Sequence, residues 1–152
     1  MSDGLKNKVK RLHLEIIGER HYDDLDQVLT EKFTYRNSFV NQVKDRSWFN
    51  NFLLDLERAF PDYSLPIEEI QIEEDMVICR YTFIGTHKSA FLKIPATGMH
   101  VTIPCISEFK FDGELINSIN TRIDMAAVRR YMAQGVKRAL ARLGKNKSAA
   151  QE

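Results

Sequence analysis

The sequence predicts an α+β fold in which a curved antiparallel sheet wraps over N-terminal helices and leads into a long C-terminal helix. Apolar residues recur at helical spacing near the start of the chain, at Leu5, Val9, Leu12, Ile16 and Ile17. Residues 75–124 instead read as three consecutive strands, and the Asp112-Gly113 pair predicts a tight turn between the last two. Helices followed by a run of neighbouring strands are typical of the α+β class.

The length and composition are those of one globular domain. The chain has 152 residues, of which 43% are hydrophobic and 28% charged, enough for a single substantial core. We expect one domain over residues 1–143 and a disordered tail over residues 144–152. The formal net charge of +1 favours neither nucleic acid nor a membrane as a partner. No signal peptide and no apolar run of about 18 residues is visible, so we expect a cytoplasmic protein.

Three further helices are predicted after the first. A short one follows Asp23 or Asp24, and an extended segment comes next at residues 31–37. Asp45 or Ser47 can cap another helix, which ends before Pro61. A strand over residues 64–72 precedes the three-strand region, and the last helix runs from Asp124 to about Leu143. Basic residues gather at its C-terminal end, where cations suit the helix dipole.

The predicted strands carry polar side chains on an otherwise apolar face. Ser107 shares its face with Val101, Ile103, Cys105 and Phe109, and Thr121 shares its face with Ile119. A sealed core would rarely hold several polar groups so close together. Pro104 also indicates an edge position or a bulge, and bulges bend sheets. The pattern therefore predicts a concave sheet that lines a pocket for a hydrophobic small molecule.

Two ionisable residues are candidates for catalysis. Asp124 is a possible acid or base if burial raises its pKa, although its place directly before a helix is also the natural N-cap position. His87 follows the first of the three strands and is a candidate proton shuttle or oxyanion donor, or else a turn-stabilising surface residue.

Polar and aromatic residues elsewhere are candidates for substrate binding. Tyr35 and Asn37 lie on one face of an extended segment and could stabilise an enolate, or be ordinary rim residues. Trp48 and Phe52 belong to a helical aromatic stripe that fits either a core or a pocket wall. Arg80 lies between apolar neighbours, where it would need a carboxylate, a ligand or a partner subunit. A homodimer through the even-numbered face of this strand is expected.

No metal or cofactor site is predicted. Cys79 and Cys105 both lie inside predicted strands, where isolated cysteines are usually buried small hydrophobes. Their spacing, and that of the histidines, matches no metal-binding pattern.

Six short segments together resemble one known family. In order along residues 8–130 they are His21-Tyr-Asp-Asp-Leu-Asp26, Ala59-Phe-Pro-Asp62, Gly85-Thr-His87, Phe91 to Gly98, Phe109-Lys-Phe-Asp-Gly113 and Ile123-Asp124. The sequence resembles the SnoaL-like polyketide cyclase (ester cyclase) family, which has the NTF2-like, cone-shaped fold. The resemblance implies a cofactor-free enzyme in which an aspartate near the end of the last strand removes a proton α to a carbonyl, followed by aldol ring closure.

The resemblance also exposes a departure from the family pattern. Thr121 aligns with the expected acid/base aspartate and Asn120 with a tryptophan, and threonine cannot act as a carboxylate base. We expect a cyclase or isomerase that acts by proton transfer on an oxygenated polyketide or terpenoid intermediate in secondary metabolite biosynthesis. Asp124 and His87 are the expected catalytic residues. The alternatives are an epoxide hydrolase-like enzyme and a non-catalytic binding or dimerisation module of the same fold.

Overall fold

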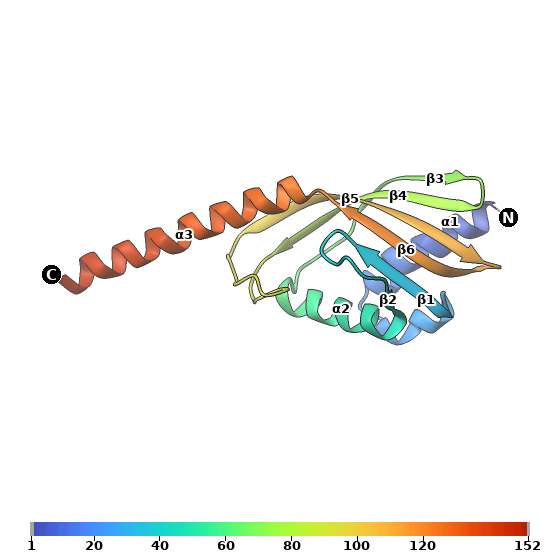
Figure 1. Ribbon diagram of the computed structural model, residues 1–152, viewed down its shortest axis with the longest axis horizontal. Coiled ribbons are helices and arrows are strands. Elements are labelled where there is room, and N and C mark those ends of the chain that lie inside the picture. The colour runs from blue at the N-terminus through green and yellow to red at the C-terminus, as the bar shows by residue number, and fades with distance from the viewer. Residues whose placement is uncertain (1, 152) are drawn as a thin grey trace.

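The protein is built on one curved sheet, described here from a computed structural model that covers residues 2–151 and the side chains of residues 3–144. The N-terminal segments are α1 (Ser2–Lys10), a π-helix (Arg11–Ile17) and a 3-10 helix (Tyr22–Gln27). Then come β1 (Leu29–Asn37), β2 (Lys44–Asp45), α2 (Arg46–Ala59), β3 (Ile67–Glu73), β4 (Met76–Thr86), β5 (His100–Asp112), β6 (Leu115–Ile123) and α3 (Met125–Gln151). The predicted α+β class is confirmed (Figure 1).

The sheet is mixed, where the sequence predicted an antiparallel one. Its strand order is β2-β1-β6-β5-β4-β3, and every neighbouring pair is antiparallel except β1 and β6. These two strands run parallel, with Tyr35 opposite Ile119 and Asn37 opposite Thr121. The three strands predicted as consecutive neighbours, β4, β5 and β6, do pair in that order. The pairing of β1 with the last strand could not be read from local pattern.

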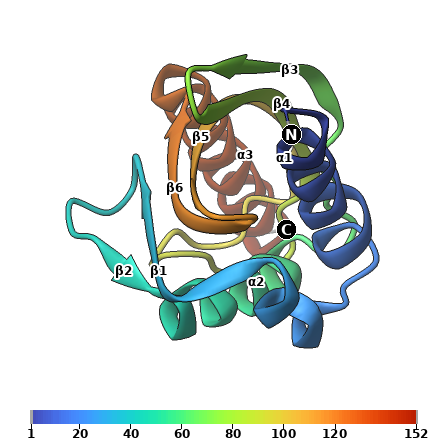
Figure 2. The same cartoon turned by 90° about the vertical axis from the view of Figure 1, so that its right-hand side faces the viewer.

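The helices close the concave side of the sheet. Seen end-on, the sheet curls over α1 and α2, which lie across its open side (Figure 2). The largest fully buried side chains come from both layers and include Leu12, Ile16, Phe33 and Phe109. Burial of these apolar surfaces is the main force that holds helices and sheet together.

The first predicted helix changes type part-way along. After α1 the chain widens into a π-helix, and the amide of Gly18 donates to the carbonyl of His13 at 3.0 Å, a step of five residues. Leu12, His13, Ile16 and Ile17 are buried in this segment. Extended π-helical turns are rare and frequently mark functional sites.

Aspartate caps begin the other two long helices. The Asp45 carboxylate accepts from the amide of Trp48 at 2.8 Å, and the Asp124 carboxylate accepts from the amide of Ala127 at 3.1 Å. Helix α3 projects away from the body (Figure 1) and ends at Gln151, beyond the end expected near Leu143. None of the described helices is both long and apolar enough to cross a membrane.

Candidate functional site

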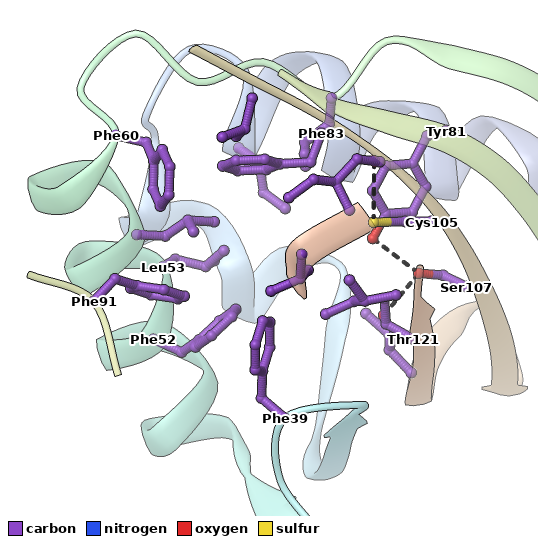
Figure 3. A pocket seen from close by; sticks show the side chains of 18 of the residues that line it. Phe39, Phe52, Leu53, Phe60, Tyr81, Phe83, Phe91, Cys105, Ser107 and Thr121 are labelled. Carbon is purple, nitrogen blue, oxygen red and sulfur yellow. Dashed lines mark hydrogen bonds between the residues drawn. The ribbon is translucent and has the colours of Figure 1, made fainter. Parts of the chain in front are cut away.

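A narrow cavity runs between the concave face of the sheet and the helices. Its volume is about 140 Å³, and it is lined by 28 side chains, most of them apolar or aromatic. So small a volume spread among so many side chains describes a thin slot. The aromatic part of the wall includes Phe39, Phe52, Phe60, Phe83 and Phe91 (Figure 3). A slot of this kind suits a flat, apolar molecule.

Hydroxyl groups cluster on one side of the cavity. Ser107 Oγ donates to the hydroxyl of Tyr81 at 3.2 Å and lies 2.7 Å from Thr121 Oγ1 (Figure 3). Tyr35 lines the same cavity, and its hydroxyl accepts from Asn37 Nδ2 at 3.2 Å. We call Tyr35, Tyr81, Ser107 and Thr121 the hydroxyl cluster.

Burial raises the pKa of both phenols of the hydroxyl cluster further above neutral pH. It raises the pKa of Tyr35 to about 12, although hydrogen bonds with Asn37 and Thr121 oppose the shift. Burial also raises the pKa of Tyr81 well above its ordinary value, and the hydrogen bonds with Ser107 and Thr121, which lower this pKa, are weaker than the effect of burial. Both phenols therefore keep their protons at neutral pH and can donate a hydrogen bond to a bound ligand.

His13 enters the cavity from the π-helix. It is 5% exposed, its ring meets that of Tyr81 edge-on at 4.7 Å between centroids, and Nδ1 has no hydrogen-bond partner. Burial lowers the pKa of His13 from 6.5 to about 4, and a hydrogen bond with the Leu65 backbone partly opposes this. The imidazole is therefore neutral at pH 7 and sits next to the hydroxyl cluster.

His87 lines the cavity near the root of α3. It is also 5% exposed, and its Nε2 has no partner. Its Nδ1 lies 3.1 Å from Thr97 Oγ1, and its ring stacks on Phe60 at 5.0 Å. Burial lowers the pKa of His87, although the Ser89 backbone opposes the shift. The structure thus places His87 in the cavity wall and not on the surface, and its catalytic role stays a prediction.

Asp124 is placed outside the cavity, against the catalytic role that the sequence suggested. It is exposed, caps α3 and lies in a shallow groove on the outer face of the sheet, together with Arg80 and Arg122. A base must reach the proton it removes, and Asp124 is not among the residues that face the cavity. Of the side chains described in residues 3–144, no aspartate or glutamate lines it.

Comparison with known proteins decides the family. The family model of the SnoaL-like polyketide cyclases matches residues 7–132, most of the chain. The chain belongs to the SnoaL-like polyketide cyclase family. No curated protein matches it. The predicted family is thus confirmed.

Solved structures agree on the SnoaL-like fold. A candidate SnoaL-like polyketide cyclase from Jannaschia sp. CCS1 is 20% identical, with a TM-score of 0.77 over 86% of this chain and 92% of that one. TsrD from Streptomyces laurentii is 19% identical, with a TM-score of 0.76 over 88% and 98%. AclR, a candidate hydroxylase from Streptomyces galilaeus, is 21% identical, with a TM-score of 0.67 over 86% and 87%. At these identities the likeness establishes the fold alone.

The remaining predicted binding residues of this SnoaL-like protein divide into three groups. Tyr35, Phe52, Ser107 and Thr121 line the cavity as expected. Asn37 and Trp48 do not line it but support Tyr35, Asn37 through its hydrogen bond and Trp48 through a stacked contact at 6.0 Å between ring centroids. Both residues thus lie behind Tyr35 in the structure, and their direct contact with a substrate stays a prediction.

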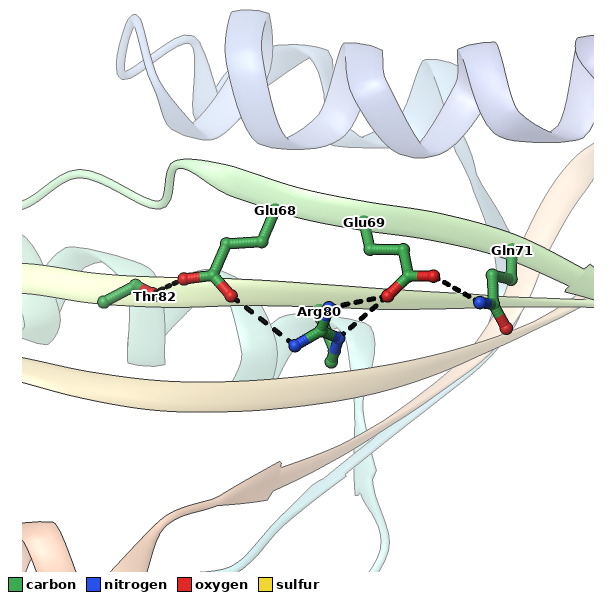
Figure 4. A network of polar contacts seen from close by, with 5 residues as sticks. All are labelled: Glu68, Glu69, Gln71, Arg80 and Thr82. Atoms are coloured by element: carbon green, nitrogen blue, oxygen red, sulfur yellow. Dashed lines mark hydrogen bonds and ion pairs between the residues drawn. The ribbon is translucent and has the colours of Figure 1, made fainter.

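Arg80 lies on the opposite side of the sheet from the cavity. Its guanidinium is 2.6 Å from Glu69 and 3.8 Å from Glu68, whose carboxylate also accepts from Thr82 at 2.6 Å (Figure 4). The structure thus gives Arg80 the carboxylate partner that its charge needs and places it away from the cavity, because side chains alternate along a strand and Arg80 follows the buried Cys79.

His13 was missed by sequence reasoning. The only available signal was its place on the apolar stripe of the first helix, beside Leu12, Ile16 and Ile17, where a histidine is usually a core residue.

The described side chains include no group of three or more histidine, cysteine, aspartate or glutamate residues that could hold a metal ion.

Proposed function

We propose that this SnoaL-like protein is an enzyme that moves a proton next to a carbonyl group of a flat, apolar molecule, without a cofactor, to isomerise it or close a ring. The observation that carries the proposal is the contact between neutral His13 and the hydroxyl cluster inside an otherwise apolar cavity. A base beside protonated donors is what enolisation requires.

His13 supplies the base. The Leu65 backbone partly opposes the fall in the pKa of His13, and Nδ1 has no hydrogen-bond partner, so we place the ring proton on Nε2. A neutral ring with its proton on Nε2 leaves a lone pair on Nδ1. With a pKa of about 4, this nitrogen has the basicity of an ordinary aspartate, whose pKa is also about 4. His13 thus replaces the carboxylate that the family pattern would place at Thr121.

Tyr35 and Tyr81 stabilise the negative charge. When a proton leaves the carbon next to a carbonyl, charge develops on the carbonyl oxygen, and fixed donors in a water-poor site stabilise it strongly. The two phenols keep their protons, and Ser107, Thr121 and Asn37 hold them in place. The cluster is therefore formed before substrate binds.

Family membership and the aromatic slot support the substrate class. Polyketide or terpenoid intermediates are apolar and carry carbonyl groups, and their ring systems suit a thin cavity walled by phenylalanines. An epoxide-opening reaction is less well supported, because it requires a carboxylate that holds the attacking water. None of the described side chains that line the cavity is a carboxylate.

The test is proton exchange. In deuterated water, NMR should show that the protein speeds deuterium incorporation next to the carbonyl of an apolar probe ketone such as β-tetralone. Binding of the ketone without exchange would reject the enzyme and favour the alternative, a non-catalytic binding module. The absence of a carboxylate from the described cavity wall is the observation on which that alternative stands.

A homodimer and a cytoplasmic location stay predictions. The outer sheet face proposed for dimerisation carries a shallow groove with Arg80 and Arg122, beside Ile106, which is 38% exposed. Sedimentation equilibrium of the wild type and of Ile106→Glu tests the dimer. A monomer in the wild type would remove it.

A further inference from the structure

We propose that His87 is a second recognition residue of the cavity and that the ligand carries an oxygen function at each end. The first oxygen is the carbonyl at the hydroxyl cluster, so this inference rests on the proposed function for that end. The second is a hydroxyl or comparable oxygen that hydrogen-bonds His87 Nε2, with an apolar ring system between the two.

His87 is a buried polar group with an unmet hydrogen bond. Its side chain is almost wholly buried in the cavity wall, yet Nε2 has no partner. Buried polar atoms nearly always have partners, and an exception in a cavity wall points to a ligand that supplies one. An apolar ligand without a second oxygen would leave this nitrogen unsatisfied.

The imidazole of His87 is fixed before any ligand arrives. Thr97 Oγ1 lies 3.1 Å from Nδ1 and itself accepts from the amide of Met99 at 3.2 Å. The amide of His87 donates to Met99, and its carbonyl accepts from Gly98, both at 2.9 Å. The stacked contact with Phe60, at an interplanar angle of 17°, holds the ring plane. Such support is typical of a recognition residue.

The hydroxyl cluster and His87 lie far apart along the cavity. Tyr81, Phe83 and Gly85 lie on the inner side of β4, and His87 follows directly after the strand ends at Thr86. Six residues of extended chain separate the Cα atoms of Tyr81 and His87 by at most about 20 Å, and side chains that converge on the concave side shorten the distance between the polar atoms. Figure 3 shows Phe60, on which His87 stacks, across the cavity from Ser107 and Thr121. The ligand must therefore be elongated.

The cavity wall between Tyr81 and His87 is apolar and closely packed. Gly85 lets Phe60 pack across the strand, since a Cβ there would lie 3.2 Å from Cβ of Phe60. Phe60 also meets Phe83 edge-on at 5.0 Å. Polar groups in the middle of a ligand would find no partner along this stretch. The pattern favours fused rings with oxygens only at the two ends.

Binding affinities of matched ketones test the inference. Ketones of two and three fused rings would be compared with analogues that carry a hydroxyl at the end remote from the ketone, using calorimetry on the wild type. A hydroxyl suits His87 because it can donate or accept. We expect it to tighten binding by about tenfold for at least one ring length. No gain at either length would overturn the proposal.

Variants assign the gain to His87. His87→Phe keeps the stacking on Phe60 but should lose the gain from the hydroxyl, so that the parent ketone and its hydroxylated analogue bind this variant equally. Thr97→Val, which removes the partner of Nδ1, should reduce that gain, and His21→Phe at an exposed position should leave it intact. A gain that survives in His87→Phe would contradict the inference.

The outcome is separable from the proposed reaction. The hydroxyl preference is read from binding alone, whereas the reaction is read from deuterium exchange. If exchange fails but the preference depends on His87, the ligand class stands and the proposed proton transfer falls. If exchange is seen but the hydroxyl preference is not, the proposed proton transfer stands and the ligand class falls.

Discussion

The imidazole of His13 meets the ring of Tyr81 edge-on, with 4.7 Å between ring centroids and an interplanar angle of 77°. The contact brings a neutral imidazole next to a phenol whose pKa burial raises well above its ordinary value. One residue comes from a π-helix and the other from the middle of β4, so only the tertiary fold makes the pair. It is the structural basis of the proton transfer proposed above.

Stability should depend on pH through His13. Its pKa is about 4 in the folded protein against an ordinary 6.5, so the unfolded chain takes up a proton first as pH falls. The contribution is present in full above pH 6.5 and is lost between pH 6.5 and 4, by about 3 kcal/mol in total.

Urea unfolding at pH 7 and pH 4 measures this loss. The difference between wild type and His13→Gln isolates the contribution of His13 from that of the carboxylates, and the exposed His21→Gln is the control. Equal pH dependence in wild type and His13→Gln would show that His13 titrates normally in the folded state.

The phenols of the hydroxyl cluster should matter for rate more than for binding. Tyr35→Phe and Tyr81→Phe each remove a donor that acts on the developing enolate, so each should slow deuterium exchange roughly 100-fold. Affinity for the parent ketone should change only a few-fold. Kinetics and calorimetry on the same samples check this, and a pure loss of affinity at unchanged rate would argue against a role in the transition state.

Asp124 should matter for stability and not for rate. Asparagine is as good an N-cap as aspartate, so Asp124→Asn should leave both stability and exchange nearly unchanged. Asp124→Ala should lower the free energy of unfolding by about 1 kcal/mol, again without slowing exchange in the folded fraction. Slower exchange in Asp124→Asn at unchanged stability would restore Asp124 as an acid or base.

Two glycines of α3 should respond in opposite ways to alanine. A Cβ at Gly135 would lie 2.4 Å from Cγ2 of Thr97, whereas nothing lies within 4 Å of the Cβ position at Gly144. Gly135→Ala should therefore lower the melting temperature and disturb the contact between Thr97 and His87. Gly144→Ala should leave it unchanged or raise it slightly, because alanine favours helix. Thermal unfolding of both variants compares them, and a stabilised Gly135→Ala would refute the close packing.

Much of the fold could be predicted because its signals are local. The Asp112-Gly113 turn, the cap at Asp45 and the alternation along β4 each depend on a few neighbouring residues, and all three are seen. The parallel pairing of β1 with β6 could not be predicted, since it joins segments about 80 residues apart and leaves no local pattern.

The candidate site was predicted only in part, for the same reason. Alternation correctly put Ser107 and Thr121 on the concave face, whereas the position of His87 after a strand left a surface or turn role equally open. Asp124 follows the end of β6, and the sequence does not say in which direction its carboxylate points. In the structure this carboxylate points to the amide of Ala127. His13 looked like a core residue because its partner, Tyr81, is distant in sequence.

The most direct test of the account compares deuterium exchange into β-tetralone by three proteins: wild type, His13→Gln and Asp124→Asn. Replacement of the base should slow exchange by roughly 100- to 10,000-fold, while Asp124→Asn should match the wild type. Normal exchange in His13→Gln together with lost exchange in Asp124→Asn would contradict the central claim, because the base would then be the aspartate on the outer groove and not the buried histidine.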